Sequence, residues 1–126
     1  MTTHTAHARV ERWDDLPGDT PMPLLERRRV IGEHAMISRV LLHSGCDVPT
    51  HAHANEQLCI VLTGRAIFGL GRENTPDRRE IEVGPGDVVV LPPWAPHSCR
   101  ALEETLILDV FSPPSTMTGI DHPTGA

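Results

Sequence analysis

The chain has 126 residues, which is enough for one domain around one hydrophobic core and too few for two. Its hydrophobic fraction of 39% and formal net charge of -6 lie far from the composition of disordered chains. The acidic balance, without a basic patch interleaved with aromatic residues, excludes nucleic acid as the expected partner. The sequence contains no Lys and no Tyr, which excludes a Schiff-base lysine and a tyrosine general acid.

The first ten residues are polar and rich in His, and they lack the apolar core of a signal peptide. No later apolar run approaches the length that spans a bilayer, so we expect a cytoplasmic protein that does not bind membranes. The cysteines Cys46, Cys59 and Cys99 are odd in number and lack the spacing of a disulfide framework, which also suits a reducing compartment.

Residues 1–26 are interrupted by prolines, and we expect them to form an extended arm. Such an arm either frays or packs across a subunit boundary. Its apolar side chains, among them Trp13 and Leu16, would stand exposed on a free arm, which favours packing against a second copy. We therefore expect a homodimer.

Residues 27–114 are expected to form one barrel domain, because prolines and glycines there separate short β-branched runs without a helical pattern. Strands are expected near Arg28–Ile31, Ala35–His43, Gln57–Thr63, Ala66–Leu70, Arg79–Val83, Asp87–Leu91, His97–Arg100 and Thr105–Phe111. Gly71–Arg78 carries Gly, Asn and Pro between two of these runs, which predicts a hairpin loop. Residues 115–126 are expected to form a C-terminal tail.

This strand pattern predicts an all-β fold. About eight short strands in a chain of this size must close into a barrel or stack as a two-sheet jelly roll, since otherwise their edges stay exposed. An immunoglobulin-like sandwich is the main alternative. The sequence lacks the paired cysteines and core tryptophan of that fold, although only true immunoglobulin domains require them.

Four residues are the candidate metal ligands. His51 and His53 are separated by one residue, so they point to the same side of an extended segment, and Gln57 continues that parity. His97 lies far downstream, after a proline-rich turn. Imidazole nitrogens and an amide oxygen suit one divalent transition-metal ion, which we expect to be Zn, Ni, Fe, Mn or Cu. The alternative is that these histidines lie apart, on the surface or in the core, and share no partner.

The spacing of these residues resembles the two signature motifs of the cupin superfamily. In this sequence the motifs read Gly45-x5-His51-x-His53-x3-Gln57-x6-Gly64 and Gly86-x5-Pro92-x4-His97. The stretch from Gly32 to Pro114 is similar to the small single-domain cupins of pectin degradation. That resemblance implies a cupin-type β-barrel, or double-stranded jelly roll. It also implies a metal held by three His and one Gln, and ring opening of an unsaturated uronate.

The sequence departs from the family at several positions. Gln57 stands where most cupins have Glu, which keeps a ligand but removes a negative charge. Trp94 stands where the second motif has Gly, and it either gates the pocket or packs on the arm. Ala101 replaces a late Asn. Ser115 stands where the pectin-degradation cupins place an Arg that binds the uronate carboxylate, and a hydroxyl replaces neither its charge nor its bidentate geometry.

The resemblance also implies roles for residues of the last strand. Asp109 matches the family's Asp and is the candidate general acid and base. Phe111 matches the family's Phe and is either a pocket wall or a substrate-stacking residue. Arg39 and Arg65 are the candidates to supply the positive charge that Ser115 lacks.

Two cysteines are candidates to face the substrate. Cys59 and Cys99 share strand parity with Gln57 and His97, so both thiols can point into the barrel near the metal. The alternative is that each is a small buried hydrophobe, which is the common role of a free Cys.

Three functions remain open. The first is a metal-dependent isomerase or lyase that acts on a small hydroxylated or carbonyl compound, similar to a sugar acid, by Lewis-acid activation and proton transfer. The second is a metal-dependent dioxygenase. The third is a cupin that binds a small molecule without catalysis, because one fold hosts many functions.

Overall fold

The structure is a computed structural model, and it describes residues 6–120. One 3-10 helical turn, η1 (Trp13–Asp15), is the only helical element in that range. The strands are β1 (Asp19–Met22), β2 (Leu25–Ile31), β3 (Met36–Leu42), β4 (Asp47–His51), β5 (Glu56–Thr63), β6 (Ala66–Leu70), β7 (Arg79–Val83), β8 (Val88–Leu91), β9 (His97–Ala101) and β10 (Thr105–Ser112). No helix between residues 6 and 120 is long and apolar enough to cross a membrane.

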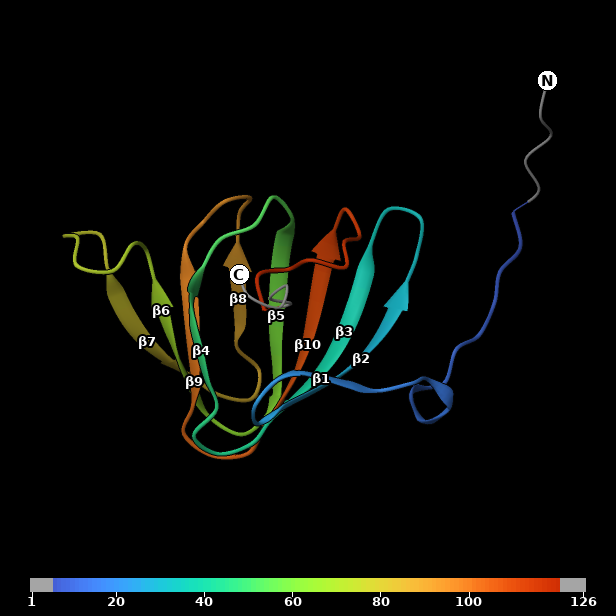
Figure 1. Cartoon of the computed structure of the whole chain (residues 1–126), viewed down its shortest axis with the longest axis horizontal. Coiled ribbons are helices and arrows are strands. Elements are labelled where there is room, and N and C mark those ends of the chain that lie inside the picture. The colour runs from blue at the N-terminus through green and yellow to red at the C-terminus, as the bar shows by residue number, and fades with distance from the viewer. Residues whose placement is uncertain (1–5, 121–126) are drawn as a thin grey trace, which may run out of the picture.

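The strands form two antiparallel sheets that face each other as a jelly-roll sandwich (Figure 1). The six-stranded sheet has the order β1-β2-β3-β10-β5-β8, and the four-stranded sheet has the order β4-β9-β6-β7. This arrangement confirms the all-β expectation. It also brings β4 and β9, which carry His51 and His97, side by side although 45 residues separate them in the chain.

The core lies between the sheets and follows the alternation of side chains along each strand. In β3, Met36, Ser38, Val40 and Leu42 are buried, whereas the residues between them are more exposed. Both sheets contribute to the core, through Val40, Val61 and Ile107 from the larger sheet and Val48, Phe68 and Cys99 from the smaller one. The interior is therefore mainly apolar, apart from the barrel end where the histidines lie and a few buried polar side chains such as Arg27, Ser38 and Thr105.

All eight expected strands are present, and the expected hairpin loop joins β6 to β7. The sequence analysis missed two further strands, β1 and β4. Each contains a proline, Pro21 or Pro49, which lacks the N–H that a central strand needs. Both strands lie at the edge of a sheet, where one side of the backbone has no partner strand and a proline is tolerated.

The expected domain limits fall as follows. β1 lies inside the expected arm, and the limit between residues 26 and 27 falls within β2. The arm is therefore joined to the larger sheet from Asp19 onward, where Asp19 pairs with Arg27. Of the expected tail, residues 121–126 lie outside the described range.

Candidate metal centre

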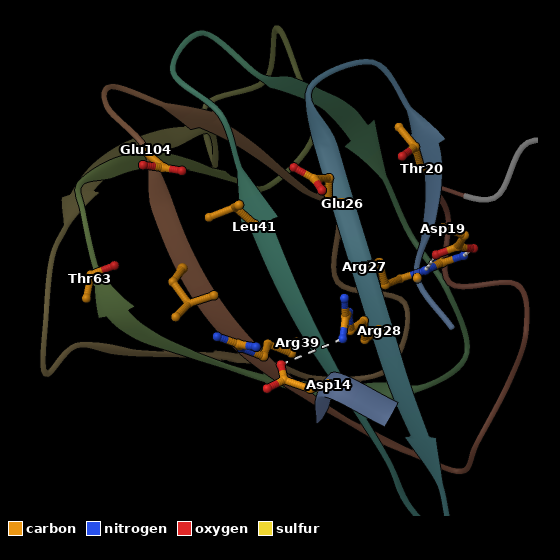
Figure 2. A pocket seen from close by; sticks show the side chains of 12 residues that line it. Asp14, Asp19, Thr20, Glu26, Arg27, Arg28, Arg39, Leu41, Thr63 and Glu104 are labelled. Atoms are coloured by element: carbon orange, nitrogen blue, oxygen red, sulfur yellow. Dashed lines mark hydrogen bonds and ion pairs between the residues drawn. The ribbon is translucent and has the colours of Figure 1, made fainter. Parts of the chain in front are cut away.

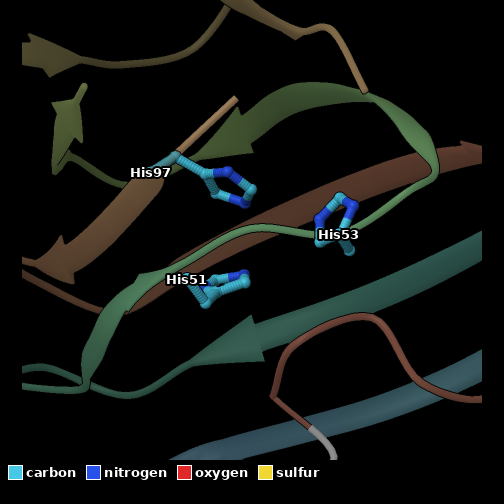
Figure 3. A group of neighbouring side chains, drawn as sticks. All are labelled: His51, His53 and His97. Atoms are coloured by element: carbon cyan, nitrogen blue, oxygen red, sulfur yellow. The ribbon is translucent and has the colours of Figure 1, made fainter. Parts of the chain in front are cut away.

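The three histidines converge at one end of the barrel, where Figure 3 shows their rings turned toward one another. His51 is the last residue of β4 and pairs directly with His97, the first residue of β9. His53 lies in the short loop that leads into β5. The ring centroids are 4.3 Å apart for His51 and His97, 5.1 Å for His53 and His97, and 5.7 Å for His51 and His53. One ring nitrogen from each histidine lies within 4.8 Å of the other two.

Backbone carbonyls fix the tautomer of each ring. Nδ1 of His51 lies 2.8 Å from the oxygen of Pro49, Nδ1 of His53 lies 3.0 Å from that of Asn55, and Nδ1 of His97 lies 2.8 Å from that of Ala95. A carbonyl oxygen only accepts hydrogen bonds, so each Nδ1 must carry the proton. In a neutral ring Nε2 then carries a lone pair, which is the form that binds a metal ion.

Two features of this cluster are suited to binding a cation. Nε2 of His97 is buried and has no hydrogen-bond partner. Nε2 of His53 lies 3.0 Å from Oε1 of Gln57, and the Gln57 amide is oriented by its own Nε2, which donates to Asp109 at 2.9 Å. When His53 is neutral and carries its proton on Nδ1, Nε2 of His53 and Oε1 of Gln57 are both acceptors. They then face each other with no proton between them. Two ligand atoms that are each about 2.1 Å from one ion, at right angles, lie about 3.0 Å apart.

The electrostatic setting also suits a neutral ligand set. The pKa of His97 is lowered to about 4, chiefly by burial and also by the neighbouring His51 and His53, against the hydrogen bond to Ala95, which raises it. His97 is therefore neutral at pH 7, with its lone pair free. Glu56, next to Gln57, is exposed and faces the outside of the sheet, as its parity predicts. The predicted set His51, His53, Gln57 and His97 thus fits one transition-metal ion.

Asp109 lies beside this cluster on β10. Its carboxylate accepts the hydrogen bond from Gln57, and it lines the cavity that His51 and His97 also line. Burial raises the pKa of Asp109 to about 6, against hydrogen bonds with Gln57 and Cys59 that lower it. A carboxyl group with such a pKa is present in both protonation states near neutral pH, which suits proton transfer.

The cavity beside the cluster is small, about 50 Å³. Phe111, Cys59 and Cys99 are among its walls, together with aliphatic side chains of both sheets. Phe111 is 4% exposed, and its ring centroid is 5.8 Å from that of His53. Burial raises the pKa of both thiols, and the nearby Asp109 raises it further. At neutral pH the cysteines therefore present uncharged S–H groups.

The two arginines proposed to replace the missing charge lie elsewhere. Arg39 faces outward from β3 and lines a pocket of about 630 Å³ on the outer face of the larger sheet, beside Asp14 and Arg28 (Figure 2). Arg65 is about half exposed and forms an ion pair with Glu82, 2.7 Å from Nη2 to Oε2. Alternation along β3 turns Arg39 away from the interior because its neighbours Ser38 and Val40 point inward.

Ser115 and Trp94 also have defined places. The Ser115 hydroxyl interacts only locally, donating to the carbonyl of Met117 and accepting from its N–H. The Trp94 side chain is 65% exposed, so the described structure does not pack it under the arm. Its backbone N–H donates to the carbonyl of His53 at 2.8 Å, so the turn supports the loop of a ligand through its main chain.

The sequence analysis missed the C-terminal residues that reach the cavity. Thr118 and Ile120 line it, and Thr118 is 5% exposed. Gly119 approaches the ring of His51 so closely that a Cβ atom there would lie 2.1 Å from Cδ2 of His51. Ile120 is an isolated aliphatic residue near the end of a mostly polar segment, and it was the available signal that this segment returns to the core.

Comparisons with other proteins agree with this architecture. An uncharacterised protein of Streptomyces coelicolor is 32% identical over 94 residues, which span 74% of this chain and 78% of that protein. KdgF from Halomonas sp. matches with a TM-score of 0.71 and 26% identity, over 81% of this chain and 92% of that chain. An RmlC-like cupin from Shewanella frigidimarina matches with a TM-score of 0.76 and 18% identity, over 87% of this chain and 95% of that chain.

A larger enzyme shares the fold as well. Oxalate decarboxylase from Bacillus subtilis matches with a TM-score of 0.74 and 22% identity, over 89% of this chain but 32% of that chain. The family model described as a cupin domain matches residues 38–111, a stretch that holds all four candidate ligands and Asp109. The resemblance expected from the motifs is confirmed, and the chain belongs to the cupin family.

Proposed function

We propose that this cupin binds one divalent transition-metal ion through His51, His53, Gln57 and His97 and catalyses an isomerase or lyase reaction on a small carbonyl or hydroxylated compound. The observation that carries the proposal is the hydrogen bond from Gln57 to Asp109. It places a carboxyl group of raised pKa beside the predicted ligands and at the wall of the same cavity. The four ligands would hold the metal ion, which polarises a carbonyl oxygen as a Lewis acid.

Asp109 would move the proton. A carbon next to a polarised carbonyl is acidic enough for a carboxylate to remove its proton, and the resulting acid can return that proton to a neighbouring atom. Gln57 holds Oδ1 of Asp109 at 2.9 Å and so limits where the carboxyl group can lie. Phe111, Cys59 and Cys99 would give this step uncharged walls.

Elemental analysis tests the metal. We expect about one metal ion per chain after purification with metal supplementation, and a loss of most of it in His51→Ala and His97→Ala. His34→Ala is the matched control, since its side chain is 90% exposed on the loop between β2 and β3. Equal and negligible metal in the wild type and in all three variants would disprove the metal site.

Oxygen dependence separates the proposed reaction from that of a dioxygenase. The proposed reaction needs no redox change, so turnover of a carbonyl compound should continue without oxygen and with a redox-inert ion such as Zn²⁺. Oxygen uptake that parallels turnover, and requires Fe, Ni or Cu, would favour the dioxygenase instead.

A further inference from the structure

The chain turns back after β10, and its last described segment returns to the barrel end that holds the histidines (Figure 1). We name residues 115–120 the C-terminal strap. It follows Pro113, whose carbonyl accepts a hydrogen bond from the side chain of Asn55, two residues beyond His53. The strap is thus anchored at its start to the same loop that presents a metal ligand.

The strap contacts the site through three consecutive residues. Gly119 has φ of +92°, and a Cβ atom at this position would lie 2.1 Å from Cδ2 of His51. Thr118 is buried, and both Thr118 and Ile120 line the cavity. Only glycine fits the middle position, because any other side chain would overlap the imidazole and strain the backbone.

This wall leaves little room. A cavity of about 50 Å³ compares with roughly 300–1,000 Å³ for ordinary ligand pockets. A sugar acid is larger than this cavity.

The charges around the cavity also argue against a sugar acid as the ligand. Within residues 6–120, no Arg or Lys side chain lines it. Arg27 is buried but does not line the cavity, and it is already held by Asp19 through contacts of 3.0 Å and 2.6 Å. A carboxylate on the ligand, away from the metal-binding end, would therefore be buried without a partner, which is costly.

We propose that the C-terminal strap determines the specificity of this site, and restricts it to compact oxygen-donor ligands with no charged group beyond the metal-binding end. This inference rests on the proposed metal site. It names a substrate class, small carbonyl compounds, that is distinct from the uronates.

Two hydroxamates with the same metal-binding head test the size limit. Formohydroxamate has four non-hydrogen atoms, whereas benzohydroxamate adds a phenyl ring. In the cobalt-loaded full chain, the visible absorption of the ion reports binding of either probe. We expect benzohydroxamate to bind about 10–100-fold more weakly than formohydroxamate, because extra volume in a packed site is destabilising.

Strap variants show whether this wall causes the difference. Ile120→Ala removes part of the wall and Gly119→Ala displaces the strap from His51, so both should reduce the preference for formohydroxamate by about 10-fold. Met117→Ala is the control, since this residue lies in the same strap but is 49% exposed. The proposal fails if the wild type binds both probes equally, or if the preference is unchanged in both Ile120→Ala and Gly119→Ala.

A metal-independent measurement separates the strap from the metal site. In the metal-free full chain we expect a nuclear Overhauser effect between the proton on Cδ2 of His51 and the Hα protons of Gly119, which is lost in Gly119→Ala. Its absence in the wild type would overturn the strap proposal even if cobalt binds. Conversely, a chain that shows this contact but binds no cobalt would disprove the proposed function and leave the strap contact in place.

Discussion

The outer pocket and the cavity at the metal centre differ in size and in how their polar groups are paired. The outer pocket on the larger sheet is about 630 Å³, and the cavity at the metal centre is about 50 Å³. Two arginines of the outer pocket are paired with carboxylates, Arg27 with Asp19 and Arg28 with Asp14. At the metal centre, by contrast, lone pairs of His53 and Gln57 face each other and Nε2 of His97 is unpaired. Unbalanced acceptors, rather than volume, indicate the chemical site.

The largest expected effect is on turnover in Asp109→Asn. If the small cavity is the reaction site, this change removes the proton-transfer group and should lower kcat by about 10²–10⁴-fold. Steady-state kinetics with a carbonyl compound that the wild type converts would measure it. Metal content should stay at the wild-type level, because Asp109 is not a predicted ligand. Full turnover in this variant would mean that a group other than Asp109 moves the proton.

Metal addition should stabilise the fold through the histidine cluster. At a free metal concentration of 100 times Kd, the free energy of unfolding should rise by about 2.7 kcal/mol. Thermal unfolding of the metal-free chain, titrated with the ion that elemental analysis identifies, measures this. His53→Ala should lose most of the increase, whereas a variant of the outer pocket, Arg28→Ala, should keep it. An equal increase in both variants would place the ion elsewhere.

The buried carboxyl group should make the metal-free chain less stable at high pH. The pKa of Asp109 is about 6 in the fold against an ordinary value of 3.8, so the fold favours the protonated form. Its contribution is fully present below pH 3.8 and is lost as pH rises through 6. Metal-free Asp109→Asn should therefore be about 1–3 kcal/mol more stable than the wild type at pH 8.

Chemical denaturation of both proteins across this pH range checks the sign. The advantage of Asp109→Asn should vanish at pH 3.5, where the wild-type carboxyl is protonated as well. An advantage that grows as the pH falls would mean that burial does not dominate at Asp109.

The smallest expected effect is that of Arg39→Ala in the outer pocket. Because Arg39 faces away from the metal centre, kcat/KM and metal content should be unchanged, and stability should change by less than about 0.5 kcal/mol. A loss of kcat/KM of about 10-fold or more would place the substrate in the outer pocket and reverse the ranking of the two pockets.

The sequence predicted that the candidate ligands lie close together, because strand periodicity and motif spacing both bear on their placement. To predict that His51 and His53 point to the same side, one extended segment was enough. For Gln57 the prediction also used the alternation of the next strand. Arg39 faces away from this cluster. The sequence analysis did not foresee this, because it did not apply the inward and outward alternation of β3 to Arg39. The edge strands β1 and β4 were missed because proline argues against a strand unless the position is known to lie at an edge.

Apart from the aliphatic Ile120, local pattern gives no signal for the strap. Thr118, Gly119 and Ile120 have neither a period nor a motif, and their place depends on a long-range contact with His51. The size of the cavity depends on this contact as well. The close approach of Gly119 to His51 arises only when the chain is packed, and one Gly in a tail segment does not predict it.

The carbonyls that hold the imidazole rings lie only two residues away from them in the chain, at Pro49, Asn55 and Ala95. Short turns thus contribute directly to the orientation of each ring. The imidazole rings are therefore already oriented in the metal-free chain, so binding of an ion would need little reorganisation of these side chains.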